Sequence, residues 1–226
     1  TRKAVKAVDA VDAMDCGRVN CMNFIIRKAM PEDIPGIALV ASEAWHQTYA
    51  ATLPEKVRLD LLDLFYGLGW LERAVARTDS LFETAVTPSG QIAGFAQWVY
   101  TPALAAATTP MLAVARSTPT PEALAPVAAA LAPPLPSATC ELTRLYIRPT
   151  SQGQGVGSAL LKHGFGCLPE GIDTVTLGVK SDNARAIRFY KKHGFVFEKE
   201  SWMPIGNVKF HLFWLSQRRG VNRWAE

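Results

Sequence analysis

Three glycines in one short polar segment could bind an anion. Gly153, Gly155 and Gly157 lie in the stretch QGQGVG, which follows an apolar-rich run and precedes a helical pattern. A strand, a glycine-rich turn and a helix in this order point several backbone N–H groups and a helix N-terminus at one place. Glycine leaves those amides accessible because it has no side chain. The segment at residues 152–157, named the glycine turn below, therefore predicts a phosphate-binding site.

Two common phosphate-binding templates do not fit the glycine turn. A P-loop needs a lysine directly after its last glycine, and Lys162 lies about one helical turn too late. The dinucleotide fingerprint GxGxxG fails because Ser158 or Leu160 stands where the third glycine is needed. A third template, [Q/R]xxGx[G/A], fits at every position from Gln152 to Gly157.

Together with its flanking segments, the glycine turn resembles the pyrophosphate loop of the GNAT superfamily of acetyl-CoA-dependent N-acetyltransferases. Four blocks carry the resemblance in the family's order, namely IRKAMPEDIPGI, GFAQW, LYIRP with the turn, and SDNARAIRFYKKHGF. The resemblance covers most of the chain, from about residue 24 to residue 215. It implies a GNAT-like acyl-CoA N-acyltransferase fold.

The elements that must position the turn follow from the apolar spacing. Strands are expected at about 23–28, 81–86, 91–100, 142–147, 174–179, 195–198 and 208–215, and helices at about 30–48, 54–77, 155–167 and 184–193. The second helical run is expected to break near Gly67, and Gly94 marks a bulge or a close backbone approach. About seven strands and about four helices predict an α/β fold with a mixed, mostly antiparallel central sheet.

Composition bounds the organisation of the chain. Its 226 residues are 49% hydrophobic and 19% charged, which is typical of a globular domain. Residues 1–21 are expected to be an appended or disordered segment, and residues 22–226 a single acetyltransferase domain with an Ala/Pro-rich insertion at about 101–139. The net charge of +4 comes from scattered basic residues and gives no sign of nucleic-acid binding. The sequence has no apolar run of about 18 residues or more, so no transmembrane helix is expected.

Cysteine spacing gives no sign of a metal site. The four cysteines have no CxxC spacing and no paired histidines nearby; they are Cys16, Cys21, Cys140 and Cys167. Neither a metal centre nor a disulfide framework is expected, and the reducing cytoplasm is the expected location.

The resemblance implies roles for individual residues in acetyl transfer. This reaction needs a deprotonated amine, hydrogen-bond donors for an oxyanion and a proton for the leaving thiolate. The strand before the turn is expected to offer backbone groups to the acyl and pantetheine arm, and the turn to bind the diphosphate. The matching cofactor-binding residues are Leu145, Tyr146, Ile147, Gln152, Gly153, Gln154, Gly155, Val156, Gly157 and Ser158.

Two further matches lie on the helix expected at 184–193 and just before it. Tyr190 matches the family's tyrosine that protonates the departing CoA thiolate, and Asn183 matches the asparagine that contacts the cofactor arm. They are seven residues apart, so one helical face can present both. A helix cap for Asn183 and a buried aromatic for Tyr190 are the open alternatives.

The general base and the acceptor site have several candidates. Glu141 matches a glutamate that deprotonates the amine in some family members, with a solvated strand-end carboxylate as the alternative. His46 is a second candidate base, with a surface histidine as the alternative. Trp45 and Tyr49 are spaced i, i+4 and are expected either to line the acceptor pocket or to form an aromatic packing pair.

The resulting prediction is an N-acetyltransferase that moves an acetyl group from acetyl-CoA to a primary amine by direct attack in a ternary complex, without a metal. No cysteine matches a nucleophile position, so no covalent acetyl-enzyme is needed. The alternatives are a catalytically inactive acyl-CoA-binding sensor or interaction module, and a transferase with a longer acyl-CoA or an oxygen acceptor. The identity of the acceptor amine, a small molecule or a peptide, stays open. Whether the protein forms a homodimer stays open as well. Neither nucleic acid nor membrane is expected as a partner.

Overall fold

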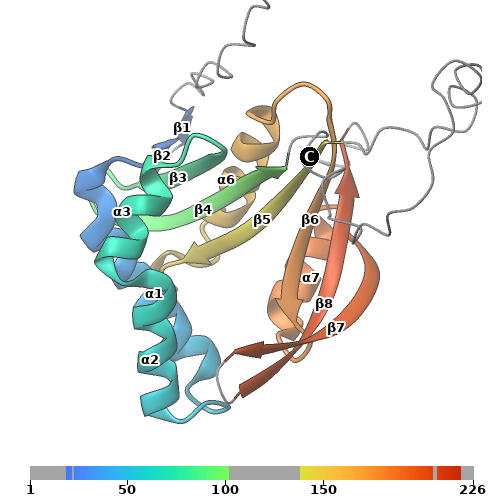
Figure 1. The fold of residues 1–226 in the computed structure, drawn as a ribbon. Coiled ribbons are helices and arrows are strands. Elements are labelled where there is room, and N and C mark those ends of the chain that lie inside the picture. Colours follow the sequence, from blue (N-terminus) through green and yellow to red (C-terminus); the bar gives the residue numbers. More distant parts are fainter. Residues whose placement is uncertain (1–18, 22, 102–137, 206–207, 220–226) are drawn as a thin grey trace, which may run out of the picture. The chain divides into compact units, whose positions relative to one another are not determined.

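A computed structural model describes residues 19–21, 23–101, 138–205 and 208–219 (Figure 1). In these ranges the chain forms eight strands and five α-helices. It divides into two compact units, Thr1–Gln97 with Arg144–Pro169 and Trp98–Thr143 with Glu170–Glu226. Strands β4 (Ile92–Thr101) and β5 (Ala138–Ile147) each contribute residues to both units.

The first unit holds the start of β4, the end of β5 and most of the helices. Its other elements are β1 (Val19–Cys21), β2 (Phe24–Lys28), β3 (Ser80–Val86), α1 (Ile34–Tyr49), α2 (Glu55–Tyr66), α3 (Leu68–Ala76) and α6 (Val156–Gly166), with 3-10 turns at Pro31–Asp33 and Pro149–Ser151. The strand order is β1-β2-β3-β4-β5, and β2 is antiparallel to both β1 and β3. Helix α6, which follows the glycine turn, packs on β3 and β2.

The start of α1 is fixed by one buried carboxylate. Asp33 accepts two hydrogen bonds from the guanidinium of Arg27, at 2.6 and 2.9 Å, and a third from the backbone N–H of Met30 at 2.8 Å. A carboxylate at the N-terminus of a helix also interacts favourably with the helix dipole. The helix predicted at about 30–48 is confirmed, although Pro31–Asp33 form a 3-10 turn and the α-helix begins at Ile34. The Asp33 side chain ties this start to β2.

Gly67 separates α2 from α3, which confirms the break predicted in the second helical run. A Cβ atom added at Gly67 would lie 2.5 Å from the carbonyl oxygen of Asp63. No other residue fits there without a shift of the backbone. The helical run predicted at about 54–77 thus consists of two helices, α2 and α3.

The second unit holds the end of β4, the start of β5 and the C-terminal elements. These are β6 (Ile172–Lys180), α7 (Ala184–Lys192), β7 (Val196–Ile205) and β8 (Val208–Arg218). The strand order is β5-β6-β8-β7, with β5 parallel to β6 and the other two pairs antiparallel. Strand β5 pairs with β6 only over its first residues. The paired positions run from Ala138, opposite Ile172, to Glu141, opposite Thr176.

The predicted fold class is confirmed: the chain is α/β, with mixed and mostly antiparallel strand pairing. One strand more than expected is found because β1 lies in the last residues of the segment predicted to be appended. Strand β7 is longer than predicted because its pairing with β8 continues as far as Ile205 and Val208. The rest of residues 1–21 and nearly all of the insertion at 101–139 lie outside the described residues, so both stay predictions.

The cysteines depart in part from the expectation. Cys140 is a free, fully buried thiol, and burial together with the nearby charge of Glu141 raises its pKa to about 12. Cys167 is disulfide-bonded, although no disulfide was expected from the cysteine spacing. The cytoplasmic location stays a prediction. None of the helices in the described ranges has the length and apolar character needed to cross a bilayer.

Candidate active site

The glycine turn has the backbone conformation that its glycines predict. Gly153 and Gly155 have φ angles of 80° and 81°, in the left-handed region that side chains disfavour. A Cβ added at either position would meet no atom within 4 Å, so the requirement for glycine is conformational and the space beside the turn is open. Helix α6 begins at Val156 with Gly155 as its N-cap. A glycine N-cap has no side chain to accept from the first-turn amides, which suits an external anion.

Two side chains of α1 hold the approach to the glycine turn. Glu43 binds the guanidinium of Arg148 through both carboxylate oxygens, each 3.0 Å from its nitrogen. One helical turn later, Gln47 accepts a hydrogen bond of 2.8 Å from the side-chain amide of Gln152, which also donates to the carbonyl of Ile147 at 3.3 Å. The Gln152 side chain therefore supports the turn from within the protein.

A buried polar pair anchors α6 behind the turn. Nδ1 of His163 lies 2.5 Å from Oε2 of Glu83 on β3, and the two side chains are only 4% and 0% exposed. Buried polar groups are costly unless they are paired. This contact therefore fixes where α6 sits on the sheet, and the sequence reading missed it because the partners are 80 residues apart.

Gly94 on β4 confirms the predicted close backbone approach. An added Cβ would lie 2.8 Å from both the carbonyl oxygen of Tyr146 and Cδ1 of Ile147, and 3.2 Å from Cγ1 of Val156. The backbone N–H of Arg148 also donates to the carbonyl of Ala93 at 2.9 Å. The end of β5 and the first residue of α6 are thus held directly against β4.

An aromatic cluster joins α1 and α2 to β5. The indole N–H of Trp45 donates to the hydroxyl of Tyr146 at 3.2 Å, and the Trp45 ring lies 4.9 Å from that of Tyr49. The ring of Tyr66 lies 5.9 Å from Trp45 and 5.7 Å from Tyr146, and burial raises the pKa of Tyr66 well above its usual value. Trp45 and Tyr49 therefore form the packing pair that was one of their two expected roles. Their contact with an acceptor stays a prediction.

Arg144 extends this cluster and was not singled out from the sequence. Its guanidinium carbon lies 4.0 Å from the ring centre of Trp70 and 5.3 Å from that of Tyr66. It also donates to the side-chain oxygen of Gln97 at 2.6 Å. Strand alternation places Arg144 and Tyr146 on one face of β5, and this signal could have identified it. A half-buried cation thus lies beside the residues predicted to meet the acceptor.

The second unit carries Glu141, Asn183 and Tyr190. Asn183 is the N-cap of α7, and its side-chain oxygen accepts from the N–H of Ala186 at 3.1 Å. Tyr190 is a buried aromatic, with its ring 5.4 Å from Phe189 and 5.6 Å from Phe195. The structural alternatives considered for Asn183 and Tyr190 are therefore both present. Their predicted functional roles are compatible with these contacts and stay predictions.

The two candidate bases differ in setting. Glu141 lies in β5, is partly exposed, and is in register with Thr176 of β6. His46 is exposed on α1, and its Nδ1 lies 3.0 Å from the carbonyl oxygen of Ser42 in the preceding turn. His46 is therefore a surface histidine with a local backbone contact, which was the alternative to its role as a base. Glu141 stays the candidate base.

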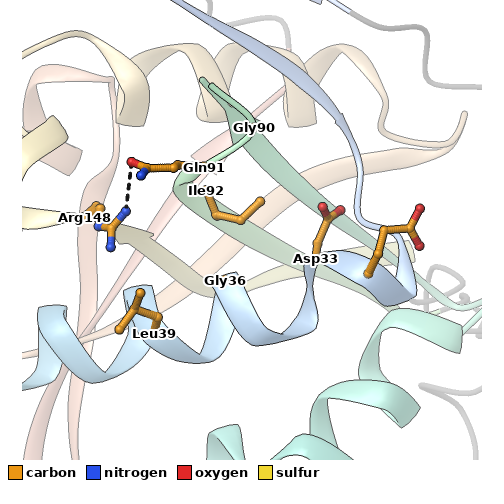
Figure 2. Close-up of a pocket in the computed structure, with 8 residues that line it drawn as sticks. Asp33, Gly36, Leu39, Gly90, Gln91, Ile92 and Arg148 are labelled. Atoms are coloured by element: carbon orange, nitrogen blue, oxygen red, sulfur yellow. Dashed lines mark hydrogen bonds between the residues drawn. The ribbon is translucent and has the colours of Figure 1, made fainter. Parts of the chain in front are cut away.

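A hollow in the first unit lies apart from the predicted site residues. Its volume is about 240 Å³, and it is lined by Glu32, Asp33, Gly36, Leu39, Gly90, Gln91, Ile92 and Arg148. Figure 2 shows Arg148 reaching toward Gln91 at one end, across a contact of 3.4 Å, and Asp33 at the other. None of the residues predicted to bind cofactor or acceptor lines it. In the ranges that the structure describes, no three His, Cys, Asp or Glu side chains are grouped to hold a metal ion.

The comparison with protein families decides the family. The sequence model of the acetyltransferase (GNAT) family matches residues 43–195. This chain belongs to the GNAT acetyltransferase family. The match includes the glycine turn, Trp45, Glu141, Asn183 and Tyr190 of this GNAT protein. No curated sequence matches the chain.

Solved structures show the same fold for this GNAT chain. The PaiA N-acetyltransferase from Thermoplasma acidophilum, in complex with coenzyme A, is 22% identical with a TM-score of 0.61, over 87% of this chain and 99% of that one. A GCN5-related N-acetyltransferase from Rhodopseudomonas palustris is 16% identical with a TM-score of 0.56, over 89% of this chain and 99% of that one. The ribosomal-protein-S18-alanine N-acetyltransferase from Escherichia coli is 17% identical with a TM-score of 0.52, over 89% of this chain and 97% of that one. At such identities the likeness concerns the fold alone.

Proposed function

We propose that this GNAT protein transfers the acetyl group of acetyl-CoA to a primary amine, which attacks directly in a ternary complex. The observation that carries the proposal is the glycine turn. Its two left-handed glycines and the N-terminus of α6 border open space. This arrangement suits a diphosphate, because several backbone N–H groups and a helix dipole act on one anion.

The residues present fit the CoA diphosphate and arm. The backbone amides of Gly153, Gly155, Val156 and Gly157 would bind the diphosphate, and no side chain of the two left-handed glycines lies in the way. The backbone of Leu145, Tyr146 and Ile147 would hold the arm, with Gln152 fixing the turn through its bonds to Gln47 and Ile147. Acetyl-CoA supplies the activated acetyl group when it is bound.

Two residues of this chain would move protons. The hydroxyl of Tyr190 would donate a proton to the departing CoA thiolate, and the carboxylate of Glu141 would accept the proton of the amine, directly or through a water. Asn183 would use its side-chain N–H₂ toward the cofactor arm, since its oxygen caps α7. These roles rest on the match of the three residues to the family motifs.

The acceptor side would be aromatic with one cation. Trp45 lies beside both Tyr146 and Tyr49, and Arg144 lies on the ring of Trp70. Aromatic rings bind apolar parts of a ligand, and a guanidinium favours an acceptor that carries a carbonyl or an acidic group besides its amine. A small-molecule or peptide amine with such a group is the acceptor class that this cluster favours.

The test combines binding and turnover on the purified chain. Calorimetry measures CoA binding, and a panel of primary amines with acetyl-CoA is screened for release of free thiol. Binding together with amine-dependent release is expected. Binding without release with any amine would favour the acyl-CoA sensor. Release with longer acyl-CoA or with alcohols only would favour the other transferase, and absence of CoA binding would refute the proposal.

A further inference from the structure

Arg58 places a guanidinium on the buried face of α2. The buried residues of this helix are Arg58, Leu61, Leu62 and Tyr66, and Arg58 is only 6% exposed. Arginine is almost never buried to this degree unless its charge is paired, because removal of an ion from water is costly. A guanidinium in this position therefore needs an anionic partner.

The described residues satisfy only part of this guanidinium. Nη1 of Arg58 donates to the backbone carbonyl of Leu53 at 3.2 Å. Nε is fully buried and has no hydrogen-bond partner, and within the described ranges no carboxylate forms an ion pair with Arg58. Nη2 also makes no hydrogen bond to these residues, but unlike Nε it is not fully buried. The edge formed by Nε and Nη2 thus lacks a protein partner, and solvent reaches it at Nη2.

Two other arginines of the chain use the same edge to bind a carboxylate. Arg148 binds Glu43 through Nε and Nη2, each at 3.0 Å, and Arg77 binds Asp79 through the same two nitrogens, each at 2.8 Å. Both are more exposed than Arg58, so their charges need less compensation. The two parallel N–H groups of this edge match two oxygens of a carboxylate or a phosphate. Arg58 therefore presents an anion-binding edge in a more buried setting.

The guanidinium lies at the corner between α1 and α2, which pack against each other (Figure 1). Leu53, whose carbonyl binds Arg58, donates its own backbone N–H to the carbonyl of Tyr49, the last residue of α1, at 2.8 Å. Because Arg58 reaches back to Leu53, its charge lies beside the N-terminus of α2. The N-cap of α2 is Pro54, which makes no side-chain bond to the first-turn amides. The partial positive charge of this helix start adds to the attraction for an anion.

We propose that Arg58 binds a carboxylate or phosphate group of a small ligand in the corner between α1 and α2. Nε and Nη2 hold two oxygens of that group, while Nη1 keeps its bond to Leu53. Binding compensates the buried charge. The site goes beyond the proposed acetyl transfer and does not depend on it. Two sources supply this chemistry: a separate small anion, or an acidic group of the acceptor amine, since Tyr66 lies on the same face of α2 about 12 Å further along.

Thermal denaturation of the full chain tests the site without turnover. Phosphate and succinate are the probes, each compared with sodium chloride at equal ionic strength, because an anion that binds only the folded state raises the melting temperature. A rise of about 3–6 °C is expected once a probe exceeds its dissociation constant about tenfold. Arg58→Met should weaken probe binding at least about tenfold and so remove most of this rise. Arg73→Met is the matched control, because Arg73 on α3 is exposed and the same charge is lost. The control should keep the rise, including any part that comes from phosphate at the glycine turn.

Three results would overturn the site. They are a parent chain that responds to neither probe, an equal response of the two variants, and an Arg58→Met chain that loses stability but keeps the full response. The last result would show that Arg58 only supports the loop through Leu53. Arg58→Lys keeps the charge and loses the two-nitrogen edge, so it should respond less than the parent. It provides the comparison if Arg58→Met does not fold.

Matched acceptors separate the two sources of the anion. Pairs of primary amines that differ only by a carboxylate or phosphate group are assayed with acetyl-CoA, and the ratio of KM for the acidic amine to KM for its neutral counterpart is measured. If the acceptor carries the anion, Arg58→Met should raise this ratio at least about tenfold, and Arg73→Met should not. A constant ratio, with a melting response that still depends on Arg58, assigns the site to a separate anion. If acetyl transfer itself fails, the melting experiment still decides the site, so the two proposals fail independently.

Discussion

Trp45 and Tyr146 are joined by a hydrogen bond of 3.2 Å from the indole N–H to the phenol oxygen. The bond connects α1 to the strand that leads into the glycine turn. Trp45 is buried, and Tyr66 packs against both rings. The side chain of Tyr146 is therefore fixed by α1, while its backbone is one of the groups proposed to hold the cofactor arm.

Removal of this bond should lower stability moderately. Trp45→Phe and Tyr146→Phe should each reduce the free energy of unfolding by about 1 kcal/mol, with an additional packing loss for the smaller ring at position 45. The double variant should lose less than the sum, because the bond can be lost only once. Urea denaturation of the four proteins gives the coupling energy. Strict additivity would show that the bond contributes nothing.

Gly155→Ala should weaken CoA binding more than it weakens the fold. Alanine at a φ of 81° is strained by roughly 1–2 kcal/mol, so the turn should shift or the protein lose that much stability. Gly171→Ala is the matched control, since Gly171 has a φ of 84° with the same open surroundings and lies before β6. Both variants should lose similar stability in denaturation. Only Gly155→Ala should raise the CoA dissociation constant in calorimetry, about tenfold or more.

Tyr190→Phe should reduce turnover and spare the fold. The phenyl ring keeps the contacts with Phe189 and Phe195, so the melting temperature should change little. Loss of a general acid typically costs about 10²–10⁴ in rate. The measurement is kcat for acetyl transfer beside the CoA dissociation constant, which should stay close to that of the parent. Unchanged turnover would remove Tyr190 from the mechanism.

The buried contact between Glu83 and His163 should contribute more to the free energy of unfolding than an exposed ion pair does. Glu83→Ala leaves a buried histidine without this partner and should lower the free energy of unfolding by about 3 kcal/mol. Lys56→Ala breaks the exposed ion pair with Asp60 on α2 and should change the free energy of unfolding by at most about 0.5 kcal/mol. Denaturant titrations of both variants make the comparison. Equal losses would show that burial does not set the strength of the Glu83 contact.

Cys140 should make the folded state less stable at alkaline pH. Its pKa is raised from 9.0 to about 12, so between these values the unfolded chain releases a proton that the folded chain keeps. Stability from this group is complete below pH 9 and falls as the pH rises toward 12. The difference in unfolding free energy between the parent and Cys140→Ala should therefore shrink by about 1.4 kcal/mol from neutral pH to about pH 10. A pH-independent difference would contradict the raised pKa.

Local signals predicted most of the fold. The glycine turn, the cap at Asn183 and the break at Gly67 depend on residues within one turn of each other, and the structure has all three. Apolar periodicity likewise located the helices and most strands. The length of β7 was underestimated because Pro204 and the charged residues near its centre hide the strand pattern, while pairing with β8 supplies the stabilisation.

The site was only partly predictable for a related reason. Tyr66, Arg144 and Glu83 acquire their surroundings from residues far away in sequence, such as Tyr146 and His163. A single sequence carries no spacing signal for such pairs. The motif blocks identified the residues that are proposed to bind the donor, whereas the cluster proposed for the acceptor side depends on packing between α1, α2 and β5.

Gly94 has a consequence for how variants of this protein will be interpreted. It is not among the residues proposed to bind cofactor or acceptor, yet any side chain there would collide with the carbonyl of Tyr146 and with Ile147. In a mutational scan, position 94 should therefore tolerate nothing but glycine and score like a catalytic position. Its intolerance would reflect the spacing of two neighbouring strands, and a screen for inactive alleles would recover it together with the glycine turn that it helps to place.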